Sequence, residues 1–500
     1  MRLILAICVM STWAAQPTAA YVSSPPGVVA WDEASVRISK LLKDPALEGC
    51  TMGVVIQHLA TGRVLYSLNP GALLMPASNQ KLVTSAAALA ILGPDFRFIT
   101  RVVAAEAPGP DGMVRGNVYL KGGGDPLLND QDLDDLAAAV RKAGVRCITG
   151  GVVGDASLFT DGPYGDGWAW DDFSYAYSPE VSALNLNENV VIVECRPGRR
   201  AGDPVAVRLR PDVGFVQVRN CAKTAAAGEP SSLRAWRVLG RNEIVVEGRL
   251  PLQGAADGGS VARVTVEDPA KFAAAVFARK LREAGVAVHG PSGTGAAPQT
   301  GVEIAEHGSP SLRDLLPRMN KPSDNLMAEC FLRMAGAVKN GDGSAAAGAR
   351  SARDWFVRQG MDCTGLVITD GSGLSRQTLL TAQSLAGVLR IAARQPWADA
   401  FRASLPIAGV DGTLRNRMKG TAAAGNCRAK TGSLSGVSSL SGYVVSADGT
   451  PLVFVILMNH YACPRRVPVQ IQDEIVELLA QTRVQPPGAP DVTSLGASHH

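Results

Sequence analysis

The chain has 500 residues, of which 46% are hydrophobic and 19% are charged, and its formal net charge is +4. This composition is that of a folded globular protein, which excludes a disordered chain, and the length predicts two or three domains. A charge this small, without a long run of Lys or Arg, gives no support for nucleic-acid binding.

The first residues predict export. Arg2 precedes a short apolar run, Leu3–Met10, and Thr18-Ala19-Ala20 is a small-residue cleavage site. Residues 1–20 therefore read as a signal peptide. No later segment has the uncharged apolar length that crosses a bilayer. We expect an exported protein of the periplasm or cell envelope, and the sequence leaves open both a peripheral membrane contact and the oligomeric state.

The numbers and spacing of cysteine and histidine indicate which disulfides and metal sites are possible. Eight of the nine cysteines lie beyond Cys8 in the predicted signal. An even number in an exported chain predicts at least one disulfide, although the pairing cannot be read. The six histidines show no metal-ligand spacing, so we expect neither a metal site nor another cofactor.

Helical and β-type patterns alternate along the N-terminal and central chain. A helix is expected over 31–42, two short strands over 51–59 and 64–68, and a buried helix from Ser78 that Gly93 can end. From residue 96 to 308 many short β-type runs follow, interrupted by helices over 131–143 and 269–284. This part reads as an inserted β-rich region of two domains.

The C-terminal part returns to helices and then to strands. Helices are expected between 311 and 394, strands over 428–431, 437–445 and 452–458, and a closing helix over 468–480. Residues 485–500 read as a flexible tail. The fold class is therefore α+β and multi-domain, with an antiparallel sheet built from both chain ends. We expect one discontinuous domain, 21–95 with 309–484, around the insert 96–308.

Ser78 and Lys81 form the first chemical cluster. Ser78 lies at a predicted helix start, and Lys81 follows one turn later on the same face. A serine hydroxyl needs a base before it can act as a nucleophile, and a desolvated lysine can supply one. A lone Ser-x-x-Lys is a weak signal, because a serine that begins a helix is usually an N-cap.

Two more clusters follow in order. Ser323-Asp324-Asn325 lies at a loop-to-helix junction, where the alternative is again a helix cap. Lys430-Thr431-Gly432 lies on a predicted strand, where a cation, a hydroxyl and a residue without a side chain suit an edge that binds an extended peptide and its carboxylate. The order Ser-x-x-Lys, Ser-Asp-Asn, Lys-Thr-Gly is the signature of penicillin-binding proteins and class A β-lactamases.

At this point the chain resembles the D-alanyl-D-alanine carboxypeptidase/endopeptidase family of class C low-molecular-mass penicillin-binding proteins. The resemblance extends from about residue 30 to 480, and its further motifs are Gly122–Pro126, Gly167–Asp172, Ser182–Asn185, Asp370–Ser375 and Leu405–Leu414. It implies a penicilloyl-serine transferase domain with two inserted domains. It also implies peptidoglycan stems ending in D-Ala-D-Ala as substrate, and covalent binding of β-lactam antibiotics.

The resemblance assigns roles to single residues. It implies Ser78 as nucleophile, Lys81 as base, and Ser323 with Lys430 as the pair that returns the proton. It also implies substrate binding by Asn325, Thr431, Gly432, Ser433 and, in the insert, Asp172, whose alternative is a structural loop carboxylate. Sequence does not settle which lysine takes the first proton, or the balance of carboxypeptidase to endopeptidase action.

Two other functions share parts of this pattern. A serine β-lactamase has the three clusters but normally lacks the insert, and the class A type needs a glutamate that activates water, which we do not identify. A non-catalytic peptidoglycan-binding scaffold would be marked by degenerate motifs, whereas all three clusters are intact here.

Overall fold

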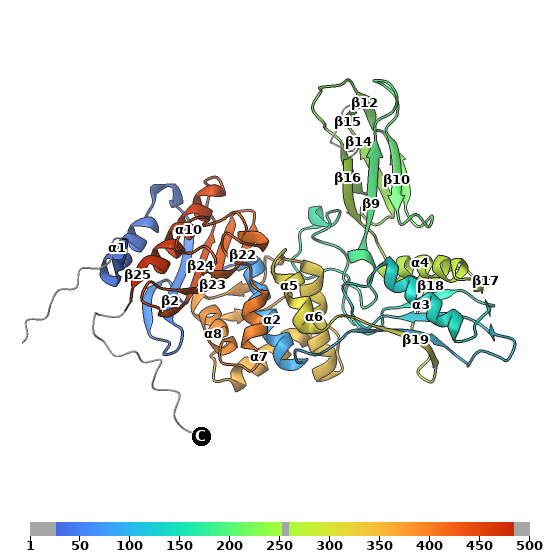
Figure 1. The fold of residues 1–500 in the computed structure, drawn as a ribbon, viewed down its shortest axis with the longest axis horizontal. Helices are drawn as coiled ribbons and strands as arrows, with labels where there is room; N and C mark the ends of the chain where they lie inside the picture. The colour runs from blue at the N-terminus through green and yellow to red at the C-terminus, as the bar shows by residue number, and fades with distance from the viewer. Residues whose placement is uncertain (1–26, 253–259, 485–500) are drawn as a thin grey trace, which may run out of the picture.

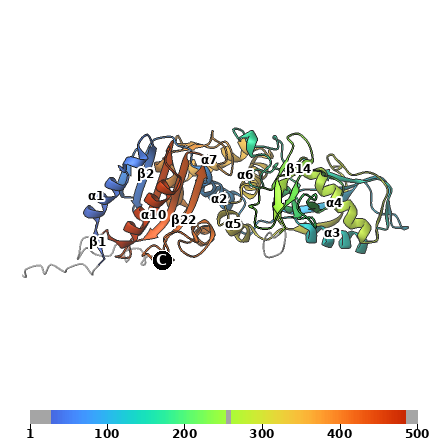
Figure 2. The ribbon, with the colours of Figure 1, turned by 90° about the horizontal axis from the view of Figure 1, so that it is seen from above.

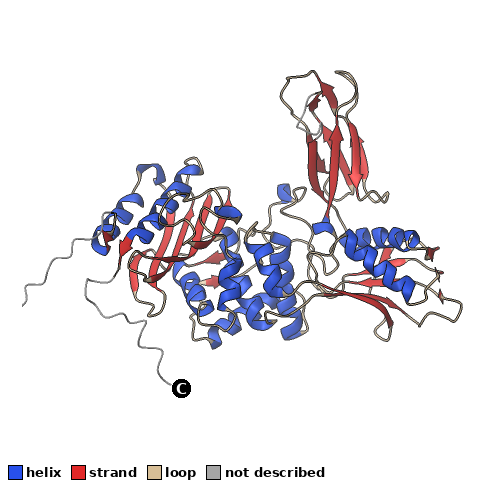
Figure 3. Cartoon of the chain, viewed as in Figure 1, coloured by secondary structure: helices blue, strands red, loops and turns tan. Residues whose placement is uncertain are grey.

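A computed structural model describes residues 27–252 and 260–484. The predicted signal peptide, 1–20, and tail, 485–500, lie outside these ranges. The molecule is elongated, with one large sheet near the chain termini and the inserted region at the far end (Figures 1 and 2). Helices and strands are mixed throughout, which confirms the α+β, multi-domain class (Figure 3).

The central sheet joins the two chain ends. Its antiparallel strands lie in the order β22-β23-β24-β2-β3. The bounds are β2 Thr51–His58, β3 Val64–Leu68, β22 Arg428–Leu434, β23 Val437–Val445 and β24 Pro451–Asn459. Register pairs Val54 with Ile456 and Thr51 with Asn459. Strands from opposite ends of the sequence therefore lie side by side, as the pattern predicted.

Alternation along these strands divides the apolar side chains between two cores. Val54 and Ile56 of β2 pack with α1 (Trp31–Leu41) and α10 (Arg466–Gln481) on one face. Val55, which points the other way, packs with α2 (Gln80–Ile91) and α8 (Ala382–Ala392) on the other face. Successive side chains of a strand point to opposite faces, so one buried strand serves both cores.

A helical layer continues from the second core. Its further members are α5 Leu312–Asn320, α6 Asn325–Asn340, α7 Ala345–Arg358 and α9 Ala398–Ser404. α2 contacts all of them, most extensively α6. The sequence reading missed α9, a short helix. This layer brings the end of α5 and the start of α6 beside the start of α2.

The inserted region has two parts (Figure 1). One is a sheet in the order β18-β8-β6-β4-β19, covered by α3 (Asp130–Lys142) and α4 (Pro269–Glu283). Its strands are β4 Ile99–Ala104, β6 Val118–Lys121, β8 Val152–Asp155, β18 Gly293–Thr294 and β19 Val302–Gly308, and the small sheet β17-β7-β5 lies at its end (Ala287–Val288, Cys147–Ile148, Met113–Val114).

The other part projects away from the rest and consists of strands in small sheets (Figure 1). They are β9 Val190–Arg196, β10 Ala206–Arg210, β11 Gln217–Asn220, β12 Lys223–Ala225, β13 Arg234–Arg237, β14 Glu243–Glu247, β15 Arg249–Pro251 and β16 Ser260–Thr265. Its buried side chains form one cluster with those of the neighbouring sheet. The two parts therefore share an apolar core.

The predicted disulfide is wrong for this structure. All eight cysteines of the described residues are free. Four of them, Cys195, Cys330, Cys363 and Cys427, are buried among apolar side chains. Cysteine in such positions behaves as a small apolar side chain, whatever the compartment.

Candidate active site

Ser78 and Lys81 lie at the start of the central helix. A short 3₁₀ turn, Ala77–Asn79, leads directly into α2, so Ser78 lies one turn before the part of the helix that carries Lys81. Lys81 is fully buried, and its Nζ donates to the Ser78 Oγ at 3.0 Å. The structure therefore brings together the two residues of the first predicted cluster.

Lys81 Nζ has two further acceptors. It donates to Asn325 Oδ1 at 2.6 Å and to the Ser372 carbonyl at 2.8 Å. An ammonium has three N–H donors, so this arrangement satisfies the protonated lysine completely. The neutral lysine has one donor fewer and a lone pair, which could accept the Ser78 hydroxyl proton instead.

The surroundings of Lys81 lower its pKa. Burial of the side chain lowers the pKa to about 8, while Asp370, Asp324 and Glu329 act in the opposite direction. Burial disfavours the charged form of a lysine, and nearby carboxylates partly restore it. The result is a lysine that can exchange a proton near neutral pH, as a general base requires.

Two buried carboxylates hold the loop that carries the Ser372 carbonyl. Glu329 accepts from the backbone N–H groups of Gly371 and Ser372 at 3.0 and 2.8 Å. Asp370 accepts from the Ser372 hydroxyl at 3.0 Å and, across to the insert, from Trp168 Nε1 at 3.0 Å. Burial raises the pKa of Glu329 to about 7. Lys81 therefore rests against a loop fixed by charged groups.

Ser323 and Lys430 form the second pair. Lys430 of β22 is fully buried, and its Nζ donates to Ser323 Oγ at 2.9 Å and to the Thr431 carbonyl at 3.0 Å. Burial, and then the positive charge of Lys81, hold the pKa of Lys430 well below its usual range. Ser323 has a φ of 70°, a left-handed conformation that is uncommon for serine. Such strain occurs often at functional sites.

Asn325 connects the site to the insert. Its Oδ1 accepts from Lys81, and its Nδ2 donates to the Tyr177 carbonyl at 2.7 Å. The Tyr177 hydroxyl in turn donates to Asp172 at 2.5 Å. Asp172 is thus linked to Asn325 through Tyr177, and among the described residues it makes no hydrogen bond or ion pair with either lysine.

The strand that carries the third cluster runs along Ser78. A Cβ on Gly432 would lie 2.2 Å from Ser439 Oγ, 2.6 Å from the Pro76 carbonyl and 3.0 Å from the Ser78 amide nitrogen. Only glycine allows this approach. Thr431 donates to Thr413 Oγ1 at 2.8 Å, and Ser433 Oγ accepts from Arg465 at 2.8 Å. β22 is an edge strand, so one side of it has no strand neighbour.

Several members of the site were not assigned a role from the sequence. They are Tyr177, Glu329, Asp370, Ser372, Thr413 and Arg465. The sequence showed the motif Asp370–Ser375. Its role could not be predicted, because it depends on backbone N–H and carbonyl groups, which every residue type except proline has in full. Glu329 lies in an apolar helix, where a lone carboxylate usually reads as a solvated residue.

Two kinds of feature are absent from the described ranges, 27–252 and 260–484. No cluster of at least three His, Cys, Asp or Glu side chains there could hold a metal ion. No helix in the same ranges has the length and apolarity needed to cross a membrane.

Comparison with known proteins gives consistent matches. The model of the D-Ala-D-Ala carboxypeptidase 3 (S13) family matches residues 34–482. A D-alanyl-D-alanine carboxypeptidase of an Actinomadura species is 41% identical over 459 residues, 89% of this chain and 84% of that protein. A second, from Haemophilus influenzae, is 30% identical and covers 86% of this chain and 89% of its own length.

Solved structures agree with these relatives. The crystal structure of penicillin binding protein 4 from H. influenzae has a TM-score of 0.79 and 29% identity, and covers 89% of this chain and 99% of that one. A second structure of that protein, in complex with a β-lactam, has a TM-score of 0.72 and 27% identity, with coverage of 89% and 97%.

Proposed function

This chain belongs to the D-Ala-D-Ala carboxypeptidase 3 family, and from that premise we propose that it is a serine D-Ala-D-Ala carboxypeptidase that forms an acyl-enzyme on Ser78. The 3.0 Å contact between Lys81 Nζ and Ser78 Oγ carries this proposal. It supplies a nucleophile and a buried amine of lowered pKa within direct reach of each other.

In the first step the neutral form of Lys81 removes the hydroxyl proton as Ser78 Oγ attacks the carbonyl of the terminal D-Ala-D-Ala bond. The carbonyl oxygen gains negative charge and needs N–H donors. The backbone N–H groups of Ser78 and Ser433 are our candidates, and the close approach of Gly432 to the Ser78 nitrogen supports them.

In the second step the C–N bond breaks and the leaving D-alanine amine needs a proton. Ser323, with Lys430 at 2.9 Å, is placed to relay one. Water then attacks the acyl-enzyme ester, which releases the shortened stem peptide and restores Ser78. The alternative, in which Lys430 acts first through Ser323, has a longer proton path, because only Lys81 contacts Ser78 directly.

Substrate binding follows from the remaining residues. In this proposal Lys430 and Thr431 bind the free carboxylate of the peptide or of a β-lactam, and Asn325 binds its amide. We propose that Asp172 binds an amino group on the stem side chain. Its link through Tyr177 to Asn325 supports that placement.

The same chemistry cleaves a cross-link when the leaving amine belongs to a second peptide, so we keep endopeptidase action within the proposal. A fast β-lactamase receives no support. Glu329 is fully buried: one carboxylate oxygen accepts from the Gly371 and Ser372 N–H groups, and the other is buried as well, so neither is exposed to water. The matched relatives are D-alanyl-D-alanine carboxypeptidases by name. With the predicted signal peptide, this supports our proposal that the protein is exported to the periplasm or cell envelope.

Intact mass after incubation with benzylpenicillin tests the proposal. We expect a stable one-to-one adduct in the wild type and no adduct in Ser78→Ala. Ser85→Ala is the matched control, because Ser85 lies on the same helix and contacts Asn320 rather than Lys81. An adduct that persists in Ser78→Ala would refute the nucleophile, and one that vanishes within seconds would favour a β-lactamase.

A further inference from the structure

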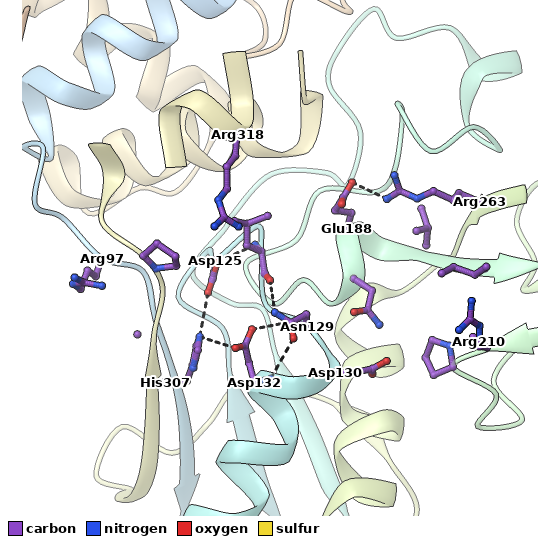
Figure 4. Close-up of a pocket in the computed structure, with 17 residues that line it drawn as sticks. Arg97, Asp125, Asn129, Asp130, Asp132, Glu188, Arg210, Arg263, His307 and Arg318 are labelled. Atoms are coloured by element: carbon purple, nitrogen blue, oxygen red, sulfur yellow. Dashed lines mark hydrogen bonds and ion pairs between the residues drawn. The ribbon is translucent and has the colours of Figure 1, made fainter. Parts of the chain in front are cut away.

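A cavity lies where the helical layer meets both parts of the insert (Figure 4). We call it the junction cavity. It has a volume of about 840 Å³, and Ser78, Lys81, Ser323 and Lys430 are not among the residues that line it. Such a volume lies in the range of pockets that enclose a small ligand. The helical layer contributes Arg318 of α5, one part of the insert Asp125 and His307, and the other part Arg210 and Arg263.

One wall of the junction cavity is acidic. Asp125 is 2% exposed, and His307 Nε2 lies 3.9 Å from its Oδ2 and 3.7 Å from Asp132 Oδ1. A third carboxylate, Asp130, has its Oδ1 buried without a hydrogen-bond partner. A buried carboxylate oxygen without a donor is costly, and a ligand N–H group would satisfy it. This wall therefore favours a cationic donor.

The arginines of the junction cavity differ in whether they already have a hydrogen-bond or ion-pair partner. Arg263 pairs with Glu188 at 2.7 Å, and Arg210 with Glu194 at 2.5 Å. Arg97 donates to the Ser309 carbonyl at 2.7 Å. Arg318 has no hydrogen-bond or ion-pair partner within residues 27–252 and 260–484. Figure 4 shows it reaching from α5 towards Asp125. An unpaired guanidinium in a cavity suits a carboxylate, which it can bind through two N–H groups.

From these two observations we propose that the junction cavity binds a short zwitterionic peptide, with a carboxylate on Arg318 and an ammonium group at Asp130. Neither a simple anion nor a simple cation satisfies both groups. A stem peptide with a free amino group and a free C-terminal carboxylate belongs to this class. That last identification rests on the proposed function, whereas the zwitterionic chemistry does not.

Helix α5 connects the junction cavity to the loop that carries Ser323. Arg318 is five residues before Ser323, at the end of the helix that leads into this loop. Burial raises the pKa of Asp324, which lies between Ser323 and Asn325, and two residues that line the cavity add smaller effects, since Glu188 raises this pKa and Arg263 lowers it. If the proposed function holds, the occupant is the second stem peptide of a cross-link.

Calorimetric titration with L-Lys-D-Ala-D-Ala tests this proposal, in a Ser78→Ala background that prevents turnover. We expect Arg318→Gln and Asp130→Asn each to weaken one binding event at least tenfold. Arg313→Gln, on the same helix but paired with Asp95, is the matched control and should bind as the parent does. Diacetyl-L-Lys-D-Ala-D-Ala, which lacks the ammonium groups, should lose the Asp130-dependent event.

Two outcomes would overturn the junction site. One is binding that neither variant changes, and the other is equal weakening by Arg313→Gln. The proposed function fails separately, because its test is the benzylpenicillin adduct on Ser78. We expect that adduct to form unchanged in Arg318→Gln with Ser78 intact. Since Arg318 is exposed and unpaired within the described ranges, its substitution should leave the fold intact, which circular dichroism checks.

Discussion

The two lysines of the site occupy different surroundings. Lys81 extends from a helix into a region where Asp370, Asp324 and Glu329 offset the cost of burying its charge. Lys430 extends from a strand, and burial and the charge of Lys81 both lower its pKa. The helix side of the site, α2 with Lys81, therefore keeps a lysine that titrates near pH 8. On the strand side, β22 with Lys430, the lowered pKa favours the neutral lysine while no substrate is bound. A base that must both accept and release a proton belongs on the first side.

The largest expected effect separates the two sides directly. Lys81→Met should slow acylation by benzylpenicillin about 10³-fold, as loss of a general base does. Lys430→Met should slow it less, because Lys430 contacts Ser323 rather than Ser78. Stopped-flow or quenched mass measurements give both rates. Equal losses, or a larger loss in Lys430→Met, would reverse the assignment.

The next effect tests the close approach of the strand side to Ser78. Gly432→Ala should slow acylation about 10²-fold, because its Cβ must displace β22 from Ser439 and Pro76 and misplace the reacting groups. Gly293→Ala is the control, since a Cβ there meets nothing within 4 Å. A normal acylation rate in Gly432→Ala would show that acylation does not depend on the close approach of β22 to Ser78.

The pH dependence assigns the titrating group. If neutral Lys81 is the base, the acylation rate should rise about tenfold per pH unit and level off above a pH of about 8. This inflection should persist in Lys430→Met, because that variant keeps Lys81. If the inflection disappeared in that variant, the titrating group would be Lys430 and not Lys81.

A smaller effect concerns stability. The folded-state pKa of Glu329 is raised from 4.5 to about 7, so the folded protein holds this proton more tightly than the unfolded chain. Its contribution is therefore present below pH 4.5 and is lost as the pH rises through 7. Glu329→Gln removes this dependence, and its Tm relative to wild type should increase by a few degrees from pH 5.5 to 8. A Tm difference between the variant and wild type that stays the same from pH 5.5 to 8 would show that folding does not raise the pKa of Glu329.

The smallest effect concerns the insert. Tyr177→Phe removes the donor to Asp172 and keeps the backbone carbonyl that binds Asn325. Acylation by benzylpenicillin should change less than about twofold, whereas KM for a stem peptide with a free side-chain amino group should change by up to about threefold. Tyr175→Phe is the control. An equal change for the acetylated peptide would refute the role of Asp172 in recognising that amino group.

The sequence was informative where chemistry depends on residue type and spacing. Ser78 with Lys81, and Ser323 with Lys430, were chosen from short motifs, and the structure places each pair within hydrogen-bond distance. Short β-rich runs at both chain ends likewise predicted one antiparallel sheet, and β2 pairs with β24 in that sheet.

Other features could not be predicted, because they depend on backbone groups or on burial. The Ser372 and Tyr177 carbonyls complete the network around Lys81 and Asn325, yet any residue type has a carbonyl. The disulfide prediction failed for a related reason. Cysteine number and compartment do not say whether two thiols meet in bonding geometry, and all eight cysteines of the described residues are free.

The sheet built from both chain ends has a consequence for how this protein is made. Met75, just before Ser78, bonds through its backbone to Asn459, which is 384 residues later. Such distant pairing forms late, because closing a long loop costs entropy before contacts compensate for it. The nucleophile is therefore synthesised early but has no Lys430 and no β22 beside it until the end of the chain arrives. We expect the growing chain to stay inactive towards peptide bonds during synthesis, without any separate inhibitory segment.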